Sequence, residues 1–105
     1  MILIHILSNE EKQAIEIADY LIERKLILNA MIMEKVSLRS QDENGEINAT
    51  RQVLLMGKTK ALLFTTIDEE LRKKYSHKMP VLYSVPIVHM DWEQVDELMD
   101  KTAKV

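Results

Sequence analysis

Apolar and polar positions change their period several times along the chain, and each change marks an expected element. Ile2 to Leu7 is almost continuously apolar and rich in β-branched residues, which is typical of a buried strand. The next segment has the apolar spacing of one helix face, through Ala14, Ile15, Ile17, Ala18, Leu21 and Ile22. We expect this helix to end near Lys25 and to begin with a capping box, with Ser8 at the N-cap and Glu11 three residues later.

The middle of the chain predicts a long hairpin. Residues 26–40 are extended in pattern, but the alternation changes parity near Glu34 and Lys35, which indicates a bulge. Asp42-Glu43-Asn44-Gly45 is a polar turn that ends in Asn-Gly, a strong hairpin signal. The return strand is expected over residues 46–58.

The last third predicts a helix, a strand and a further helix. Leu63, Ile67 and Leu71 lie four apart and indicate a helix over about residues 60–75. A strand follows over residues 81–87, and a second capping box at Asp91 opens a helix that ends near residue 102. The first six elements have the βαββαβ order of an α+β, ferredoxin-like fold. We therefore expect a single ferredoxin-like domain over residues 1–105, with a long hairpin and an added C-terminal helix.

The strands of this expected sheet are apolar on both faces. In the first strand Ile2, Ile4 and Ile6 lie on one face, and Leu3 and Leu7 lie on the other. A four-stranded sheet with two helices on one face leaves its other face in water, where polar residues should alternate with apolar ones. We therefore expect other subunits to cover the second face, with the hairpin at residues 30–56 reaching across and the last helix covering part of it at most.

Composition narrows the function classes. The 105 residues are 47% hydrophobic and 30% charged, as in ordinary globular proteins. Seventeen acidic against 14 basic residues give a formal charge of −3, which argues against a nucleic-acid partner. No apolar run approaches the length of a membrane span and no signal peptide is evident, so we expect a cytoplasmic protein without a membrane partner.

The sequence also argues against an enzyme. It contains no cysteine, which excludes disulfides, thiolate nucleophiles and cysteine-based zinc sites. It has no nucleophile-elbow motif, and its two glycines are too few for a dinucleotide-binding or Walker-type loop.

Three stretches of the chain together resemble a known family. They are residues 8–26 with the preceding strand, residues 44–59 ending in Val53-Leu54-Leu55-Met56-Gly57-Lys58-Thr59, and residues 79–87, Met79-Pro80-Val81-Leu82-Tyr83-Ser84-Val85-Pro86-Ile87. In this order and spacing they are similar to the CutA family of divalent-cation tolerance proteins, and Trp92 follows where that family often carries a tryptophan. The resemblance implies a ferredoxin-like homotrimer related to PII-type signalling trimers. It also implies a role in tolerance of copper or another divalent cation.

Three departures from the family pattern affect residues that could bind a metal ion. Residues 28–33 read Leu-Asn-Ala-Met-Ile-Met where the family usually has a cysteine, and residues 38–41 lack the usual aromatic side chains. In Tyr75-Ser76-His77-Lys78-Met79-Pro80, tyrosine and histidine are exchanged relative to the family and lysine replaces glutamate. A metal site built on those family positions therefore does not carry over unchanged.

The remaining candidate metal ligands are the three histidines and the methionines. Among the histidines we favour His77, because it lies in a predicted loop; His5 is expected to be satisfied at a subunit interface. Met31 and Met33 share one strand face, a spacing that suits Cu(I), although methionine is also a common core filler. No histidine motif with metal-ligand spacing occurs locally, so a site would have to be assembled across chains.

The alternative function is a PII-like regulatory trimer that binds a small effector or a partner protein without metal. Such trimers bind effectors in clefts between subunits, and this chain offers the turn at residues 41–46 and the loop at residues 75–79 as cleft walls.

Overall fold

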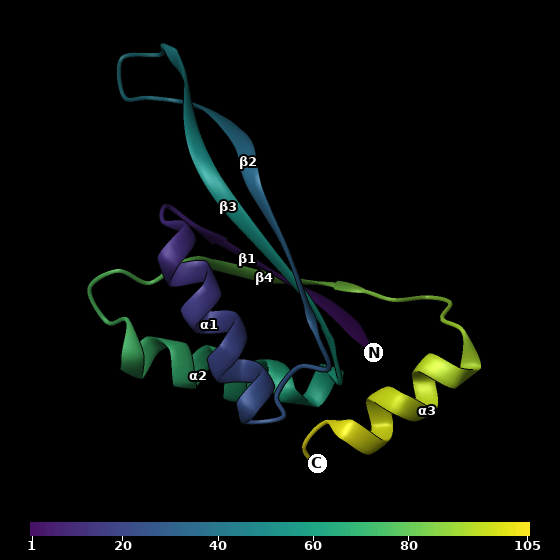
Figure 1. Cartoon of the computed structure of the whole chain (residues 1–105). Helices are drawn as coiled ribbons and strands as arrows, with labels where there is room; N and C mark the ends of the chain where they lie inside the picture. The colour runs from purple at the N-terminus through teal and green to yellow at the C-terminus, as the bar shows by residue number, and fades with distance from the viewer.

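The computed structural model describes all 105 residues and has the expected α+β architecture (Figure 1). Its elements in chain order are β1 (Ile2–Ser8), α1 (Glu11–Glu23), β2 (Ala30–Gln41), β3 (Ile47–Thr59), a 3₁₀ turn (Ala61–Leu63), α2 (Phe64–Lys74), β4 (Val81–Pro86) and α3 (Trp92–Lys101). The sheet has the strand order β2-β3-β1-β4, and every neighbouring pair is antiparallel. The ferredoxin-like topology with a long hairpin and an added last helix is therefore confirmed.

The hydrophobic core lies between one face of the sheet and the helices α1 and α2, which lie on the same side (Figure 1). The burial pattern of β1 alternates strictly, because every second side chain points toward the helices. Helix α2 and the turn before it contribute Leu63, Ile67 and Leu71 as their spacing predicted. In α1 the predicted stripe is too wide, because only Ala14, Ile17, Ala18 and Leu21 face the sheet, and Ile15 and Ile22 are 43% and 40% exposed. The core cluster consists of Ile4, Ile6, Ile17, Ala18, Leu21, Leu26, Ile27, Leu55, Leu63, Ile67 and Leu71.

The strand predicted from Leu26 begins four residues later, at Ala30. The chain first closes α1 at Lys25, a non-glycine residue with φ 58°, and the amide of Leu26 donates to the carbonyl of Leu21 at 2.8 Å. This is the Schellman pattern of a helix C-terminus, and it directs Leu26 and Ile27 into the core. The predicted bulge is confirmed by a register shift between Met33 and Val36.

Both predicted capping boxes lack their side-chain hydrogen bonds. Ser8 is the last residue of β1, and the N-cap of α1 is Glu10. The Ser8 hydroxyl accepts from the amide of Glu10 at 3.2 Å and donates to the side-chain oxygen of Gln13, so it closes the strand-to-helix turn instead. Asp91 is the N-cap of α3 as predicted, but its carboxylate makes no capping bond.

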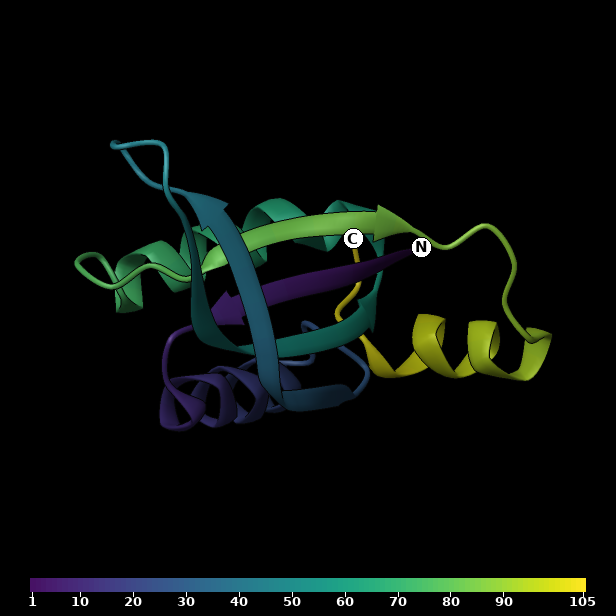
Figure 2. The same cartoon turned by 90° about the horizontal axis from the view of Figure 1, so that it is seen from above.

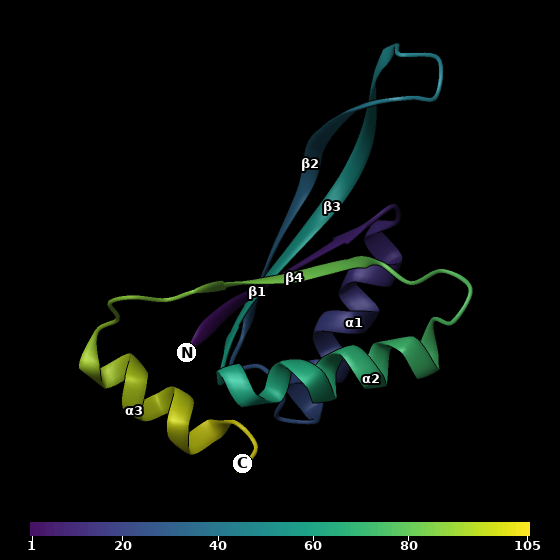
Figure 3. The same ribbon diagram turned by 180° about the vertical axis from the view of Figure 1, so that it is seen from behind.

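Helix α3 lies beyond one end of the sheet, on the side of α1 and α2 (Figure 3). The buried ammonium of Lys60 donates to the carbonyls of Thr102 and Ala103 at 3.3 and 2.8 Å, and the amide of Ala103 donates to the carbonyl of Lys25 at 2.7 Å. These bonds hold the end of the chain against the helix layer, and α3 leaves the second sheet face open. None of the helices has the length and apolar character needed to cross a bilayer.

Candidate functional site: the open sheet face and the cleft at its edge

The second face of the sheet is open and mostly apolar, as the lack of alternation predicted. Seen from above, the strands lie in front of α1 and α2, with the hairpin strand β2 crossing in front of β1, and no helix lies over them (Figure 2). Strand pairing arranges the side chains of this face in rows across the sheet. One row is Met33–Leu54–Leu7–Val81, the next is Met31–Met56–His5–Tyr83, and the third is Lys58–Leu3–Val85.

The outer members of these rows expose much of their surface. The exposed fraction is 57% for Met31, 51% for Met33, 57% for Val81 and 44% for Tyr83. Contiguous apolar exposure of this kind marks an interaction surface in a soluble protein. The sheet therefore presents a broad apolar surface on one side and a sealed core on the other.

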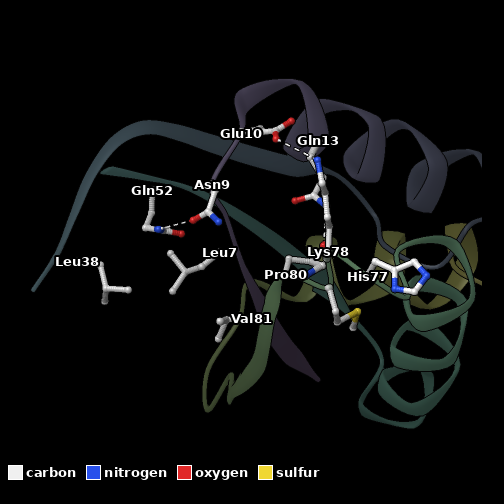
Figure 4. Close-up of a pocket in the computed structure, with 11 residues that line it drawn as sticks. Leu7, Asn9, Glu10, Gln13, Leu38, Gln52, His77, Lys78, Pro80 and Val81 are labelled. Atoms are coloured by element: carbon white, nitrogen blue, oxygen red, sulfur yellow. Dashed lines mark hydrogen bonds and ion pairs between the residues drawn. The ribbon is translucent and has the colours of Figure 1, made fainter. Parts of the chain in front are cut away.

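A cleft of about 450 Å³ lies at the end of the open face where β1 meets α1 (Figure 4). Leu7, Leu38 and Val81 form its apolar wall, and the loop before β4 closes its other side. The remaining lining residues are Asn9, Glu10, Gln13, Gln52, His77, Lys78, Met79 and Pro80. The cleft thus joins an apolar surface to a group of polar side chains, as small-molecule sites do.

Hydrogen bonds hold the polar side of the cleft in place. The amide nitrogen of Gln52 donates to the side-chain oxygen of Asn9 at 2.6 Å, which ties β3 to the turn after β1. The amide nitrogen of Gln13 donates to the carbonyl of Lys78 at 2.9 Å, and the Lys78 ammonium lies 3.8 Å from the Glu10 carboxylate. The loop before β4 is therefore fastened to the first turn of α1, and both signs of charge line the cleft.

The structure places the predicted metal ligands in two separate regions. His77 is exposed and lines the cleft, where its ring points away from Asn9 (Figure 4). Met31 and Met33 lie on the open face, as their spacing predicted, and neither lines the cleft. No group of three or more histidine, cysteine, aspartate or glutamate side chains is positioned to hold a metal ion within one subunit. A single chain therefore does not bring His77 and the methionine pair together.

The two segments predicted to line a cleft between subunits lie in different places in one subunit, and the cleft between subunits stays a prediction. The loop at residues 75–79 does line the cleft, but the opposite wall comes from Leu38 and Gln52 at the base of the hairpin. The turn at residues 41–46 is instead closed on itself. The Asp42 carboxylate accepts from the amides of Asn44 and Glu46, both at 2.9 Å, and these bonds together with the Asn48 side chain hold the pKa of Asp42 below its usual range.

Two further groups beside the cleft have shifted pKa values. A hydrogen bond with the Glu34 carboxyl, together with repulsion between the two groups, raises the pKa of Glu11. Burial, followed by the nearby Glu16 carboxylate, raises the pKa of Tyr75, whose hydroxyl lies 3.4 Å from Glu16. Burial and the Glu16 carboxylate both favour the protonated hydroxyl of Tyr75, so this side chain stays neutral at the start of the loop.

His5 has a hydrogen-bond partner within its own subunit, and its expected contact at a subunit interface stays a prediction. Its Nδ1 lies 3.1 Å from the hydroxyl of Tyr83, and the two rings are 5.0 Å apart. Sequence reasoning missed this pair because the two residues are 78 positions apart and only the β1–β4 register makes them neighbours.

Comparison with known proteins identifies the family. The family model described as "CutA1 divalent ion tolerance protein" matches residues 2–96, which is most of the chain. The chain belongs to the CutA1 family. No curated protein matches it. The family assignment confirms the resemblance that the three sequence stretches indicated, and family membership implies a role in divalent cation tolerance.

Solved CutA1 structures share the fold of this chain. The divalent cation tolerance protein CutA1 from Thermus thermophilus is 24% identical with a TM-score of 0.86, covering 98% of this chain and 100% of that chain. CutA1 from Oryza sativa is 18% identical with a TM-score of 0.87, covering 99% and 94%. The periplasmic divalent cation tolerance protein CutA from Archaeoglobus fulgidus is 24% identical with a TM-score of 0.83, covering 96% and 98%.

Proposed function

We propose that this CutA1-family chain works as a homotrimer in the tolerance of copper and that it binds the metal directly. The observation that carries the proposal is the open apolar face of the sheet, because its exposed methionine, valine and tyrosine side chains need a cover in water. A second and third copy of the same chain supply that cover, since closed symmetry is the usual way in which soluble proteins bury such a surface.

The proposed copper ligands are His77, Met31 and Met33. His77 is exposed at the cleft, so its imidazole is accessible to Cu(II), and the methionine pair offers thioethers that suit Cu(I). Because one chain keeps these two groups apart, we propose that donors from neighbouring subunits complete the coordination of His77.

Native mass spectrometry of the purified protein, with and without added Cu(II), tests the proposal. We expect a trimer of three 12.2 kDa chains that takes up copper in a saturable ratio. His77→Ala should lower this uptake, whereas His89→Ala, which removes a histidine outside the cleft, should leave it unchanged. A monomer would contradict the proposed trimer, and a trimer that binds no copper would contradict the proposed role in copper binding.

The cleft itself favours a second candidate function, which is binding of a small effector by a PII-like trimer. Its volume of about 450 Å³ is within the range of small-molecule sites, and its lining combines an apolar wall with Glu10, Lys78 and three amide side chains. This function predicts that a small metabolite raises the melting temperature while copper does not. Leu38→Glu, which places a charge in the apolar wall, should abolish that stabilisation.

A further inference from the structure

Helix α3 is attached to the rest of the subunit at few points. Leu98 is the only fully buried side chain of this helix, whereas Trp92 and Met99 are 70% and 49% exposed. The linker before the helix, residues 87–91, has no regular secondary structure. Figure 3 shows α3 beyond the end of the sheet, joined to β4 by this linker. Little apolar burial therefore holds α3 in place, which is typical of segments that open locally.

A buried lysine from another part of the chain holds the C-terminal end of α3. Lys60 is 7% exposed, and its ammonium donates to the carbonyls of Thr102 and Ala103 at 3.3 and 2.8 Å. Thr102 is the C-cap residue of α3, so its carbonyl has no partner within the helix. A cation is also favoured at this end of a helix by the helix dipole. Lys60 thus supplies hydrogen bonds and positive charge at the same point.

The other buried ties of α3 lie close to Lys60. The amide of Ala103 donates to the carbonyl of Lys25 at 2.7 Å, and the hydroxyl of Thr102 donates to the carbonyl of Leu98 at 2.6 Å. Nearer the start of the helix, the Lys58 ammonium donates to the side-chain oxygen of Gln94 at 2.9 Å, but this bond is exposed to water. The buried ties are therefore confined to the last turn of α3 and the two residues after it.

We propose that residues 92–103, the C-terminal arm, open away from the subunit as one unit about the linker at residues 87–91, and that Lys60 sets how often they do so. The core cluster lies between the sheet and the helices α1 and α2 and contains no residue of the arm, so it stays packed when the arm opens. Opening brings the Lys60 ammonium and the Leu98 side chain into water, so the arm controls the exposure of both groups. The proposal concerns a single subunit and goes beyond the proposed function.

Hydrogen exchange of backbone amides, measured by NMR on the full chain, tests whether the arm is a unit. We expect the amides of Val95, Thr102 and Ala103 to share one opening constant and to be at least about a hundredfold less protected than the amide of Ile6 in β1. Equal protection of the arm and β1 would show that the arm opens only when the whole chain unfolds. Protection that falls gradually along the arm would show fraying of single residues. Either result would overturn the proposal.

Variants test the role of Lys60. Lys60→Met keeps most of the aliphatic side chain and removes the ammonium, so it should raise the opening constant of the arm about tenfold or more and leave the protection of Ile6 unchanged. The matched control Lys101→Met removes an exposed ammonium of α3 that lies 3.4 Å from the Glu97 carboxylate. It should change the opening constant by no more than about threefold. An unchanged opening constant in Lys60→Met would show that Lys60 does not hold the arm closed.

Chemical labelling of the wild-type chain tests the same point without a change at Lys60. An N-hydroxysuccinimide ester of acetic acid acylates lysine amines that are in contact with water, so Lys60 should react at least about tenfold more slowly than Lys101. Leu98→Ala removes most of the buried side chain of the arm and keeps both lysines, so it should speed the reaction of Lys60 and leave that of Lys101 unchanged. Equal rates for the two lysines in the wild-type chain would overturn the proposal.

Discussion

A carboxylate placed on the open sheet face should separate the proposed trimer into monomers. Val81 is 57% exposed in a single subunit and ends the apolar row Met33–Leu54–Leu7–Val81. Burial of its remaining surface in an assembly is worth about 1 kcal/mol. Val81→Asp loses that contribution and adds the cost of burying an unpaired charge, about 3 kcal/mol after relaxation.

The two effects together amount to about 4 kcal/mol for each subunit and about 12 kcal/mol for the trimer. Since each 1.4 kcal/mol is a factor of ten, the association constant should fall by roughly nine orders of magnitude. The monomer itself should keep its fold, because the new carboxylate stays in water when the face is open. Size-exclusion chromatography with light scattering at micromolar concentration should therefore show a shift from three chains to one.

The control is Ile15→Asp, which makes a similar change on an exposed side chain of α1, away from the open face. It should remain trimeric. If Val81→Asp also remains trimeric with an unchanged circular dichroism spectrum, the open face is not the contact surface and the argument from exposed apolar rows is wrong.

Three further predictions concern stability. Leu71 is fully buried in the core cluster, so Leu71→Ala should lower the free energy of unfolding by about 3 kcal/mol in urea denaturation; a loss below about 1 kcal/mol would contradict the packing described above. The folded pKa of Asp42 is lowered from its ordinary value of 3.8, so the turn is fully stabilised above that pH and loosens as the pH falls through the lowered value. The amide signal of Glu46 should report this loosening, and in Asp42→Asn it should show no acid transition. The pKa of Glu11 is raised by Glu34 above its ordinary value of 4.5, so protonated Glu11 contributes stability below that pH, and this contribution is lost as the pH rises through the raised value. Glu34→Gln should therefore raise the melting temperature at pH 7 and have little effect at pH 3.

Most of the secondary structure could be predicted from the sequence, because its apolar residues recur with clear helix or strand spacing and its turn residues are distinctive. The spacing of Leu63, Ile67 and Leu71 predicted the buried side of α2, and Asn44-Gly45 predicted the hairpin turn. The parity change near Glu34 predicted the bulge. These signals are local, so no knowledge of distant contacts was needed to interpret them.

Element boundaries were less predictable where side chains had competing partners. Ser8 satisfies the capping pattern in sequence, yet it pairs with Gln13 and the amide of Glu10 because β1 continues through it. Lys25 adopts a left-handed backbone conformation that is uncommon for lysine and that the sequence does not predict. As a result β2 begins at Ala30, later than the strand start predicted at Leu26. Such outcomes depend on the balance between alternative hydrogen bonds, which residue spacing does not show.

The sequence by itself determined the order of the elements, the two apolar faces of the sheet and the likeness to the CutA family. Only the tertiary structure decided which candidate residues meet. It separated His77 from Met31 and Met33, and it brought His5 beside Tyr83 and Met56. The reason is physical: neighbours across a sheet are chosen by strand order and register, and these depend on packing of the whole chain against one core rather than on any local pattern.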